Sequence, residues 1–411
     1  MSKTVRMAPR GSRKRPVEYS ILYTATLCLL AGGAVMVYSA SSAESLLDGS
    51  GDPSFYLKRY VVFGLVGLVL LHAASRHGLA VIRAITPLLL VGSFVLTFAV
   101  MLPGIGVTAN GATRWLGAGP LQFQPSELLK VSLVLYAAQV LAARPRSTRT
   151  LGGLVKPLLL VVGAACLLLL KQPDMGTSMV ICFAIGALLV AAGTPTRHLT
   201  LIAGVLAGLA LIVALIEPYR RARLTSFLDP FSDAGDSGFQ AVQALTAIGS
   251  GGFFGVGLGE SVQKIFYLPE AHTDMVLAII GEELGLLGIL GVIGLYGMIA
   301  YAGLRAAKLA GDLHAKLLAA GITSLILCQA TLNFFAVLGM APLTGVPLPF
   351  LSYGSTNLIV LLGAMGLLLN VASTGGRAGM RTRRPRLEAI QGGAESGLRR
   401  AAEAARARAH I

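Results

Sequence analysis

The run LGLLGILGVIGLYGMIAYAGL, residues Leu284–Leu304, holds 21 residues and no charged side chain. Because an α-helix rises about 1.5 Å per residue, such a run can cross the roughly 30 Å hydrocarbon core of a bilayer. Further apolar runs of the same character fill most of the chain and are separated by short polar segments. The sequence therefore predicts an all-α polytopic membrane protein with about ten transmembrane helices, judged by hydropathy.

The predicted spans divide the chain into a basic N-terminal segment, residues 1–18, a transmembrane domain, residues 19–373, and a basic tail, residues 374–411. The first apolar run is too long for the core of a cleaved signal peptide, so we expect it to remain as a helix. A long segment, Glu217–Glu283, separates the seventh and eighth spans. The spans are Tyr19–Tyr38, Tyr60–Ala74, Ala80–Leu102, Ser126–Ala142, Pro157–Leu170, Thr177–Ala192, Leu199–Ile216, Leu284–Leu304, Leu317–Leu338 and Leu351–Val371.

Charge is scarce and unevenly placed. Charged residues make up 13% of the chain, against about 25% in soluble domains. The net charge of +15 comes from Arg and Lys at both ends and in every second short loop. By the positive-inside rule, both termini are expected in the cytoplasm and Glu217–Glu283 outside. This distribution argues against nucleic-acid binding. The loop residues are Arg76, Arg83, Arg144, Arg146, Arg149, Lys156, Arg197, Arg305, Lys308 and Lys316.

The four cysteines, Cys28, Cys166, Cys182 and Cys328, each lie inside an apolar run with no nearby Cys or His in the sequence. Cysteine is among the residues most often buried as a small hydrophobe. We therefore expect buried packing residues and neither a disulfide nor a metal site.

The first polar cluster is GATRWLGAGPLQFQPSELLK, residues Gly111–Lys130. Pro125 is expected just inside a helix start, with Glu127 in the first turn and Lys130 three residues on, where the two charges can pair. The pair is either a structural cap or the wall of a ligand cavity. Arg114, beside the only Trp, is either an interface anchor or a phosphate contact.

Two further segments offer polar groups near membrane depth. In KQPDMGTS, residues Lys171–Ser178, Asp174 either caps the sixth span or faces the bundle interior. The Gly-rich GSGGFFGVGLGESVQK, residues Gly249–Lys264, is consistent with backbone crowding. A phosphate cradle with Lys264 is the alternative, although the segment matches neither the P-loop nor the dinucleotide pattern.

The densest cluster is LPEAHTDMVLAIIGEELG, residues Leu268–Gly285, which holds Glu270, His272, Asp274, Glu282 and Glu283. We expect a short extra helix at the outer surface, Thr273–Glu283, with Thr273 as its N-cap. A continuous helix would place Asp274 and Glu282 about 12 Å apart. That spacing favours one carboxylate acting as a general base over a close carboxylate pair.

The last cluster is PLTGVPLPFLSYGSTN, residues Pro342–Asn357, with Ser352 near its centre. Its prolines predict broken backbone before the tenth span. Such backbone at membrane depth normally lines a cavity, and an ordinary outer loop is the alternative.

Taken in order, these segments resemble the SEDS family (shape, elongation, division and sporulation) over about Tyr19–Val371. The matching motifs look more like the FtsW branch than the RodA branch. One departure is Ser355, which follows Gly354 where the family usually has a second Gly. The motifs are MVYSASS, GATRW, QPSELLK, QPDMGTS, FLDPF, GLGESVQK, LPEAHTD, GEELG and PLPFLSYG.

The resemblance implies an inverting peptidoglycan glycosyltransferase that uses lipid II as donor and acceptor outside the cytoplasmic membrane and releases undecaprenyl diphosphate. By motif position, Asp274 would be the essential carboxylate. Lys130, Arg114, Lys264 or a divalent cation would face the diphosphate. The other substrate-binding candidates are Glu127, Asp174, Glu270, His272, Glu282 and Ser352.

The resemblance also implies a class B penicillin-binding transpeptidase anchored in the membrane as partner, with other division proteins at the septum. The motifs leave three alternatives open: a lipid II flippase, a scaffold for a transpeptidase, and an elongation-type polymerase. No ligand spacing in the sequence identifies a metal.

Overall fold

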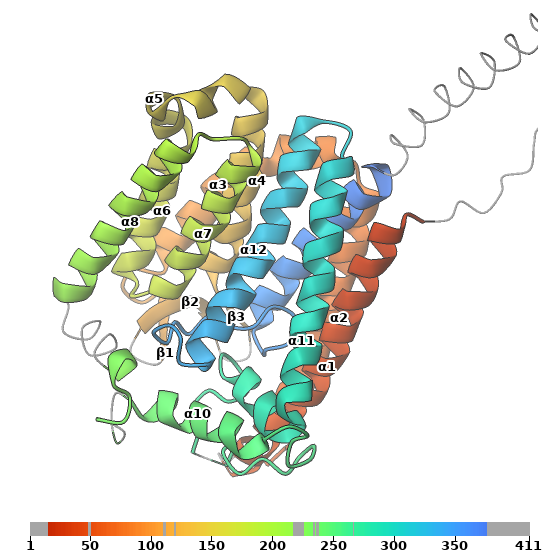
Figure 1. Ribbon diagram of the computed structural model, residues 1–411, viewed down its shortest axis with the longest axis vertical. Coiled ribbons are helices and arrows are strands. Elements are labelled where there is room, and N and C mark those ends of the chain that lie inside the picture. The colour runs from red at the N-terminus through yellow and green to blue at the C-terminus, as the bar shows by residue number, and fades with distance from the viewer. Residues whose placement is uncertain are drawn as a thin grey trace, which may run out of the picture.

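The computed structural model describes residues 15–47, 51–109, 112–118, 121–216, 226–232, 235, 238–265 and 267–375. The basic tail and most of the basic N-terminal segment lie outside these ranges, so their predicted boundaries stay predictions. Within them the chain is a bundle of long helices, with one small sheet and one short helix across one end (Figure 1).

Every predicted span has a helical counterpart. In the described part of the chain, eight helices are long and apolar enough to cross a membrane, with Leu151–Lys171 counted as one, and α7 and α8 are shorter apolar helices. The polytopic helical fold is therefore confirmed, and the count of ten spans stays a prediction. The helices are α1 Val17–Leu47, α2 Phe55–Arg76, α3 Leu79–Ala99, α4 Pro125–Ala143, α5 Leu151–Leu154, α6 Leu160–Lys171, α7 Met175–Ala191, α8 Thr196–Ile216, α10 Phe239–Gly251, α11 Val276–Leu309, α12 Leu313–Val337 and Ser355–Gly375.

The short connections also take defined forms. A 3₁₀ helix covers Pro145–Arg149, and a π-helical turn, Val155–Leu159, joins α5 to α6. Asp312 caps α12 by accepting a hydrogen bond from the Ala315 amide at 2.8 Å. A side-chain cap of this kind satisfies one of the free amides at a helix start.

The short basic loops gather at one end of the bundle, the upper end in Figure 1, which we call the basic end. There Arg305 pairs with Glu18 at 2.7 Å, which joins the end of α11 to the start of α1. The amide of Asn370 donates to the carbonyls of Ser75 and His77 at 2.9 and 2.7 Å. The charge pattern predicted that these helix ends lie on one side of the membrane, and in the structure they do lie at one end of the bundle.

The opposite end carries a three-stranded antiparallel sheet that the all-α prediction missed. Its strands are β1 Gly106–Ala109, β2 Ala112–Ala118 and β3 Leu121–Phe123, in the order β1-β2-β3. Such short strands between long apolar spans leave too little alternating sequence to predict them. We call this end, where α10 also lies across the bundle, the sheet end (Figure 1).

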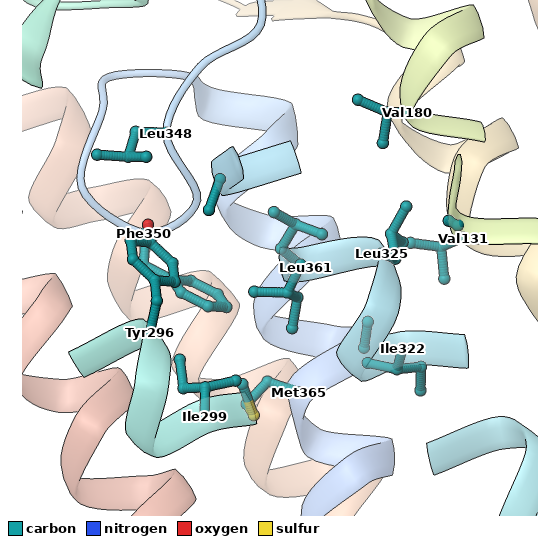
Figure 2. Packing of buried hydrophobic residues seen from close by; sticks show 14 of the residues in the cluster. Val131, Val180, Tyr296, Ile299, Ile322, Leu325, Leu348, Phe350, Leu361 and Met365 are labelled. Carbon is teal, nitrogen blue, oxygen red and sulfur yellow. The ribbon is translucent and has the colours of Figure 1, made fainter. Parts of the chain in front are cut away.

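The core is built around α12, which packs against α4, α7 and α11. Figure 2 shows this packing, with Val131 of α4 and Val180 of α7 near Leu325 of α12. Lys130 is among the largest fully buried side chains, so a charged group lies within this apolar core. A buried charge requires a partner, which points to the site described below.

The cysteine prediction is wrong in two respects. The Sγ atoms of Cys166 and Cys182 are 3.7 Å apart between α6 and α7, although both thiols are free. Cys28 is exposed and the other three cysteines are half-buried. A sequence separation of 16 residues concealed a contact that the antiparallel packing of two helices creates.

The predicted outer helix before the eighth span is also wrong in its start and its placement. The helix begins at Val276, and Thr273 is not its N-cap. The predicted short helix before the span is nevertheless present: residues 276–283 are helical and buried, and non-helical backbone at Gly285, where φ is 65°, separates them from the span within α11. A break in this region was expected, and glycine permits it because it lacks Cβ.

Candidate active site

An irregular segment rich in proline, Pro342–Tyr353, enters the bundle at the sheet end before the last helix, and we call it the proline loop. Leu348 and Phe350 of this loop are buried, and Phe350 lies beside Tyr296 of α11 (Figure 2). Side chains from other helices donate hydrogen bonds to four backbone carbonyls of the proline loop. Gln329 donates to Pro347 O at 2.8 Å, Asn333 to Val346 O at 2.9 Å, Tyr296 to Pro349 O and Tyr60 to Phe350 O.

These bonds are what irregular backbone needs at membrane depth, because no water is available there to bind its carbonyls. Gln329 and Asn333 lie four residues apart on α12, hence on one face of that helix. The expectation of a broken, internal backbone before the last helix is confirmed. The last helix begins at Ser355, and the predicted start at Leu351 is four residues early.

Asp274 lies in the turn immediately before α11 and is 8% exposed. The side chain of Asn333, which also binds the proline loop, donates to Asp274 O at 2.7 Å. Thr273 Oγ1 donates to the carboxylate at 3.3 Å. Asn333 therefore fixes the backbone of Asp274 against the proline loop.

Gly345 of the proline loop faces the other carboxylate oxygen of Asp274. A Cβ added at Gly345 would stand 3.8 Å from Asp274 Oδ2. Gly345 is itself exposed and has φ of +66°, a conformation that favours glycine. The glycine thus keeps the approach to this oxygen narrow but free of a side chain.

The predicted pair Glu127–Lys130 is confirmed. Lys130 Nζ lies 2.9 Å from Glu127 Oε2 and donates to Gln329 Oε1 at 2.8 Å. Both side chains are almost fully buried. Since Gln329 in turn binds Pro347 O, the ion pair on α4 is connected to the proline loop through α12.

Asp174 satisfies both of its predicted alternatives. It caps α7 by accepting from the Thr177 amide at 3.2 Å, and it is 4% exposed. Its Oδ2 has no hydrogen-bond partner among the residues that the structure describes. Next to it, a Cβ on Gly176 would fall 2.5 Å from Thr344 O, so the start of α7 packs tightly against the proline loop.

Arg114 of β2 connects the sheet to the turn before α7. Its Nε donates to Gln172 O at 3.2 Å, and its Nη2 donates to Pro173 O. The side chain is half-buried. Arg114 therefore holds the turn that carries Asp174, and a guanidinium has five N–H donors, so this contact does not use them all.

His272 lies in a cluster of aromatic and acidic side chains at the outer edge of the same region. Its ring is 4.2 Å from the ring of Tyr56 and 5.7 Å from that of Tyr353, measured between centroids. His272 Nδ1 is 3.2 Å from Glu44 Oε2. Nearby Glu270 is half-buried, has φ of 55°, and accepts from Thr273 Oγ1 at 2.7 Å.

Lys264 and Glu282 lie in a separate network around the kink of α11. Lys264 Nζ donates to Glu283 Oε1 at 2.9 Å, Ser39 Oγ at 3.2 Å and Gly259 O at 2.6 Å. Glu282 accepts from Ser261 Oγ and from the Val262 amide at 3.0 Å. Both side chains are thus engaged in holding the loop before Asp274, and their predicted substrate contacts stay predictions.

Ser352 has a local role in the turn that ends the proline loop. Its Oγ accepts from the Leu348 amide at 2.8 Å, and its own amide donates to Leu348 O at 3.0 Å. Sequence reasoning missed Ser39, Glu44, Tyr56, Gln329 and Asn333. Two amide side chains four residues apart inside an apolar span were the one available signal for Gln329 and Asn333.

Contacts therefore join Arg114, Asp174, Glu127, Lys130 and Asp274 around the proline loop. Among the described residues, no group of three or more His, Cys, Asp or Glu side chains is placed to hold a metal ion. The divalent cation thus stays a prediction without an identified ligand set. A pocket of about 220 Å³ lies between α2, β3 and the last helix, and none of the predicted site residues lines it.

A sequence model of a family described as "Cell cycle protein", which covers FtsW, RodA and SpoVE, matches residues 20–375. The chain belongs to this family. It is 44% identical over 356 residues to the probable peptidoglycan glycosyltransferase FtsW of Thioalkalivibrio sulfidiphilus, which covers 85% of this chain and 88% of the relative. It is 38% identical to the stage V sporulation protein E of Bacillus subtilis, over 86% of this chain and 96% of that protein.

Solved structures of family members share the fold. A chain from a study of how a peptidoglycan synthase complex coordinates polymerization and crosslinking superposes with a TM-score of 0.70 at 31% identity, covering 85% of this chain and 96% of its own. The rod shape determining protein RodA of Thermus thermophilus gives a TM-score of 0.62 at 29% identity, with coverages of 85% and 95%. The predicted family and polytopic helical fold are confirmed, and the cytoplasmic placement of both termini stays a prediction.

Proposed function

We propose that this chain is a peptidoglycan glycosyltransferase of the cytoplasmic membrane, which polymerises lipid II on its outer face and releases undecaprenyl diphosphate. The relatives named probable peptidoglycan glycosyltransferase FtsW support this function. The observation that carries it is Asp274, a carboxylate held by Asn333 against the buried proline loop at the end of the bundle opposite the basic loops.

In this reaction Asp274 acts as a general base. It takes the proton of the acceptor 4-hydroxyl while that oxygen bonds to the anomeric carbon of the donor. The bond from this carbon to the diphosphate breaks, the diphosphate leaves with the electron pair, and the configuration inverts. A positioned base of this kind typically contributes about 10²–10⁴-fold. A single base fits the site, since Glu282 is already bound by Ser261 and Val262.

The leaving diphosphate needs a cationic partner. All three N–H donors of Lys264 are directed at protein oxygens, and two of the three on Lys130 are. Arg114 has donors beyond its two bonds to the turn before α7. Of these three predicted cations, Arg114 is therefore the best placed to bind the diphosphate.

The partner in this proposal is a membrane-anchored class B penicillin-binding transpeptidase, at the division septum with other division proteins. A solved structure with the same fold comes from a complex that coordinates polymerization with crosslinking. The relatives named FtsW, at 44% and 40% identity, favour division over elongation. Depletion in the source cell distinguishes the two roles, because filaments indicate division and round cells indicate elongation.

The test separates the polymerase from a lipid II flippase. The purified chain is reconstituted with lipid II and no nucleotide, and both glycan products and lipid movement across the bilayer are measured. We expect glycan chains that disappear in Asp274→Ala. Movement of lipid II with no polymer, equal in the wild type and in Asp274→Ala, would refute the polymerase and support the flippase.

A further inference from the structure

The first part of the connection between α10 and α11, residues 252–265 and 267, exposes apolar side chains although it lies outside every predicted span. Phe254 is 77% exposed and Phe253 is 54% exposed. The only charged residues in the segment are Glu260, which is exposed, and Lys264, which is buried. Loops in water are dominated by Gly, Pro, Asn, Asp and Ser, and a cluster of exposed large apolar side chains marks an interaction surface. The exposed apolar residues are Phe253, Phe254, Val256, Leu258, Val262, Ile265 and Tyr267.

The backbone of this segment is fixed beside α11 at a defined level. The Leu286 amide donates to Gly252 O at 3.0 Å, and the Leu287 amide donates to Phe253 O at 3.3 Å. Leu286 and Leu287 are themselves exposed and begin a stripe of exposed apolar residues along α11 that continues through Leu290, Ile293, Tyr301 and Leu304. Because α11 is long and apolar enough to span a membrane, we expect this exposed apolar stripe to be its lipid-facing side. Phe253 thus lies next to the first turn of a lipid-facing surface.

The kink of α11 holds the same segment through further backbone bonds. At Gly285 the helix frees backbone groups, and the segment binds them. The Val256 amide donates to Glu282 O at 3.0 Å, and the Gly257 amide donates to Glu283 O at 3.1 Å. Together with the bonds of Leu286 and Leu287, four freed groups are satisfied by protein. These bonds hold the segment rigidly beside the first turn of the exposed stripe on α11.

We propose that this segment lies in the interface of the membrane leaflet at the sheet end, with Phe253 and Phe254 inserted among the lipid chains beside Leu286 and Leu287. Aromatic side chains gather at this level in membrane proteins, and burial of an apolar face drives interfacial binding. The occupant of the patch is lipid because the patch continues the lipid-facing stripe of α11. The segment then anchors the chain that leads to Asp274 at the bilayer surface.

The chain has one tryptophan, Trp115, which makes a fluorescence test direct. Phe254→Trp is introduced into a full chain that carries Trp115→Phe, and the protein is reconstituted in nanodiscs. If Trp115→Phe unfolds the protein, Trp115→Tyr takes its place. Quenching is measured with lipids brominated along the acyl chain and, separately, with acrylamide in water. Leu290→Trp on the lipid-facing stripe is the lipid control, and Arg146→Trp on the exposed 3₁₀ helix of the basic end is the aqueous control.

We expect Phe254→Trp to show a blue-shifted emission and at least half the bromolipid quenching of Leu290→Trp, with weak acrylamide quenching. Lipids brominated near the head of the acyl chain should quench it more than lipids brominated near the end. Emission and quenching like those of Arg146→Trp would refute the proposal. Protection from both quenchers would also refute it, because protein would then cover the patch.

Discussion

Removing one member of the buried ion pair Lys264–Glu283 is expected to destabilise the protein far more than removing both. The side chains are 6% and 0% exposed, and Lys264 Nζ lies 2.9 Å from Glu283 Oε1. Ser39 Oγ donates to the same carboxylate at 2.6 and 2.8 Å. Neither charge has water to replace a lost partner. Breaking such a pair from one side typically costs about 3–5 kcal/mol.

Lys264→Met and Glu283→Gln should therefore each lower the free energy of unfolding by about 3–5 kcal/mol, because each leaves an uncompensated buried charge. The double variant keeps a side-chain oxygen at position 283 to accept from Ser39, and it has no charge at positions 264 and 283. Its cost should be smaller than that of either single variant, which gives a coupling energy of about 3 kcal/mol or more in the double-mutant cycle.

The assay is equilibrium unfolding of the full chain in mixed micelles with rising dodecyl sulfate, followed by circular dichroism. The matched control is Lys58→Met, which breaks the exposed pair with Asp52 at 2.6 Å. Lys58 and Ser54 lower the pKa of Asp52 to about 2, so the Asp52 carboxylate is ionised at neutral pH. Its loss should be too small to resolve, as for most exposed pairs. Single variants of Lys264 and Glu283 that each cost less than about 1 kcal/mol and add independently would refute the reasoning.

Three further substitutions test the site and its support. Asn333→Leu leaves two buried carbonyls unpaired and should lower the free energy of unfolding by about 1–3 kcal/mol. The control is Asn370→Leu, because the Asn370 amide also binds two carbonyls, but at the basic end. Its free energy of unfolding should fall by as much, yet only Asn333→Leu should abolish polymer formation. Gly285→Ala should destabilise the protein by about 1 kcal/mol or more, because φ at Gly285 is positive. Gly291→Ala is the control: there is open space around its Cβ position, so it should be neutral or slightly stabilising. Equal melting curves for the two variants would contradict the role of the kink. Gly345→Val places a branched side chain in contact with the Asp274 carboxylate, so the turnover rate on lipid II should fall. Because φ at this position is +66°, the free energy of unfolding should also fall, by about 1 kcal/mol or more. An unchanged turnover rate would show that substrate does not approach from this side.

Local features of the site could be predicted from the sequence because they depend on a few adjacent residues. The helix start at Pro125, the pair Glu127–Lys130 and the cap at Asp174 are each set by the spacing of residues within one helical turn. The break before the last helix follows from three prolines in one loop. These are the predictions that the structure confirms.

The remaining features depend on contacts between distant parts of the chain. Asn333 reaches Asp274 across 59 residues, and Lys264 reaches Ser39 across 225. No periodicity within one segment can indicate which buried acceptor such a side chain meets. For the same reason the sequence could not indicate that Lys264 and Glu282 also bind the groups around the kink of α11.

The initial rate of glycan formation from lipid II by Asp274→Asn tests the central claim most directly, because the substitution keeps the size of the side chain and removes only its capacity to accept a proton. With unfolding curves matched to the wild type, we predict a loss of about 10²-fold or more, and no growth when the variant replaces the wild-type gene. A rate within about tenfold of the wild type, or full complementation, would contradict a catalytic carboxylate at Asp274 and leave the chain as a scaffold for its partner.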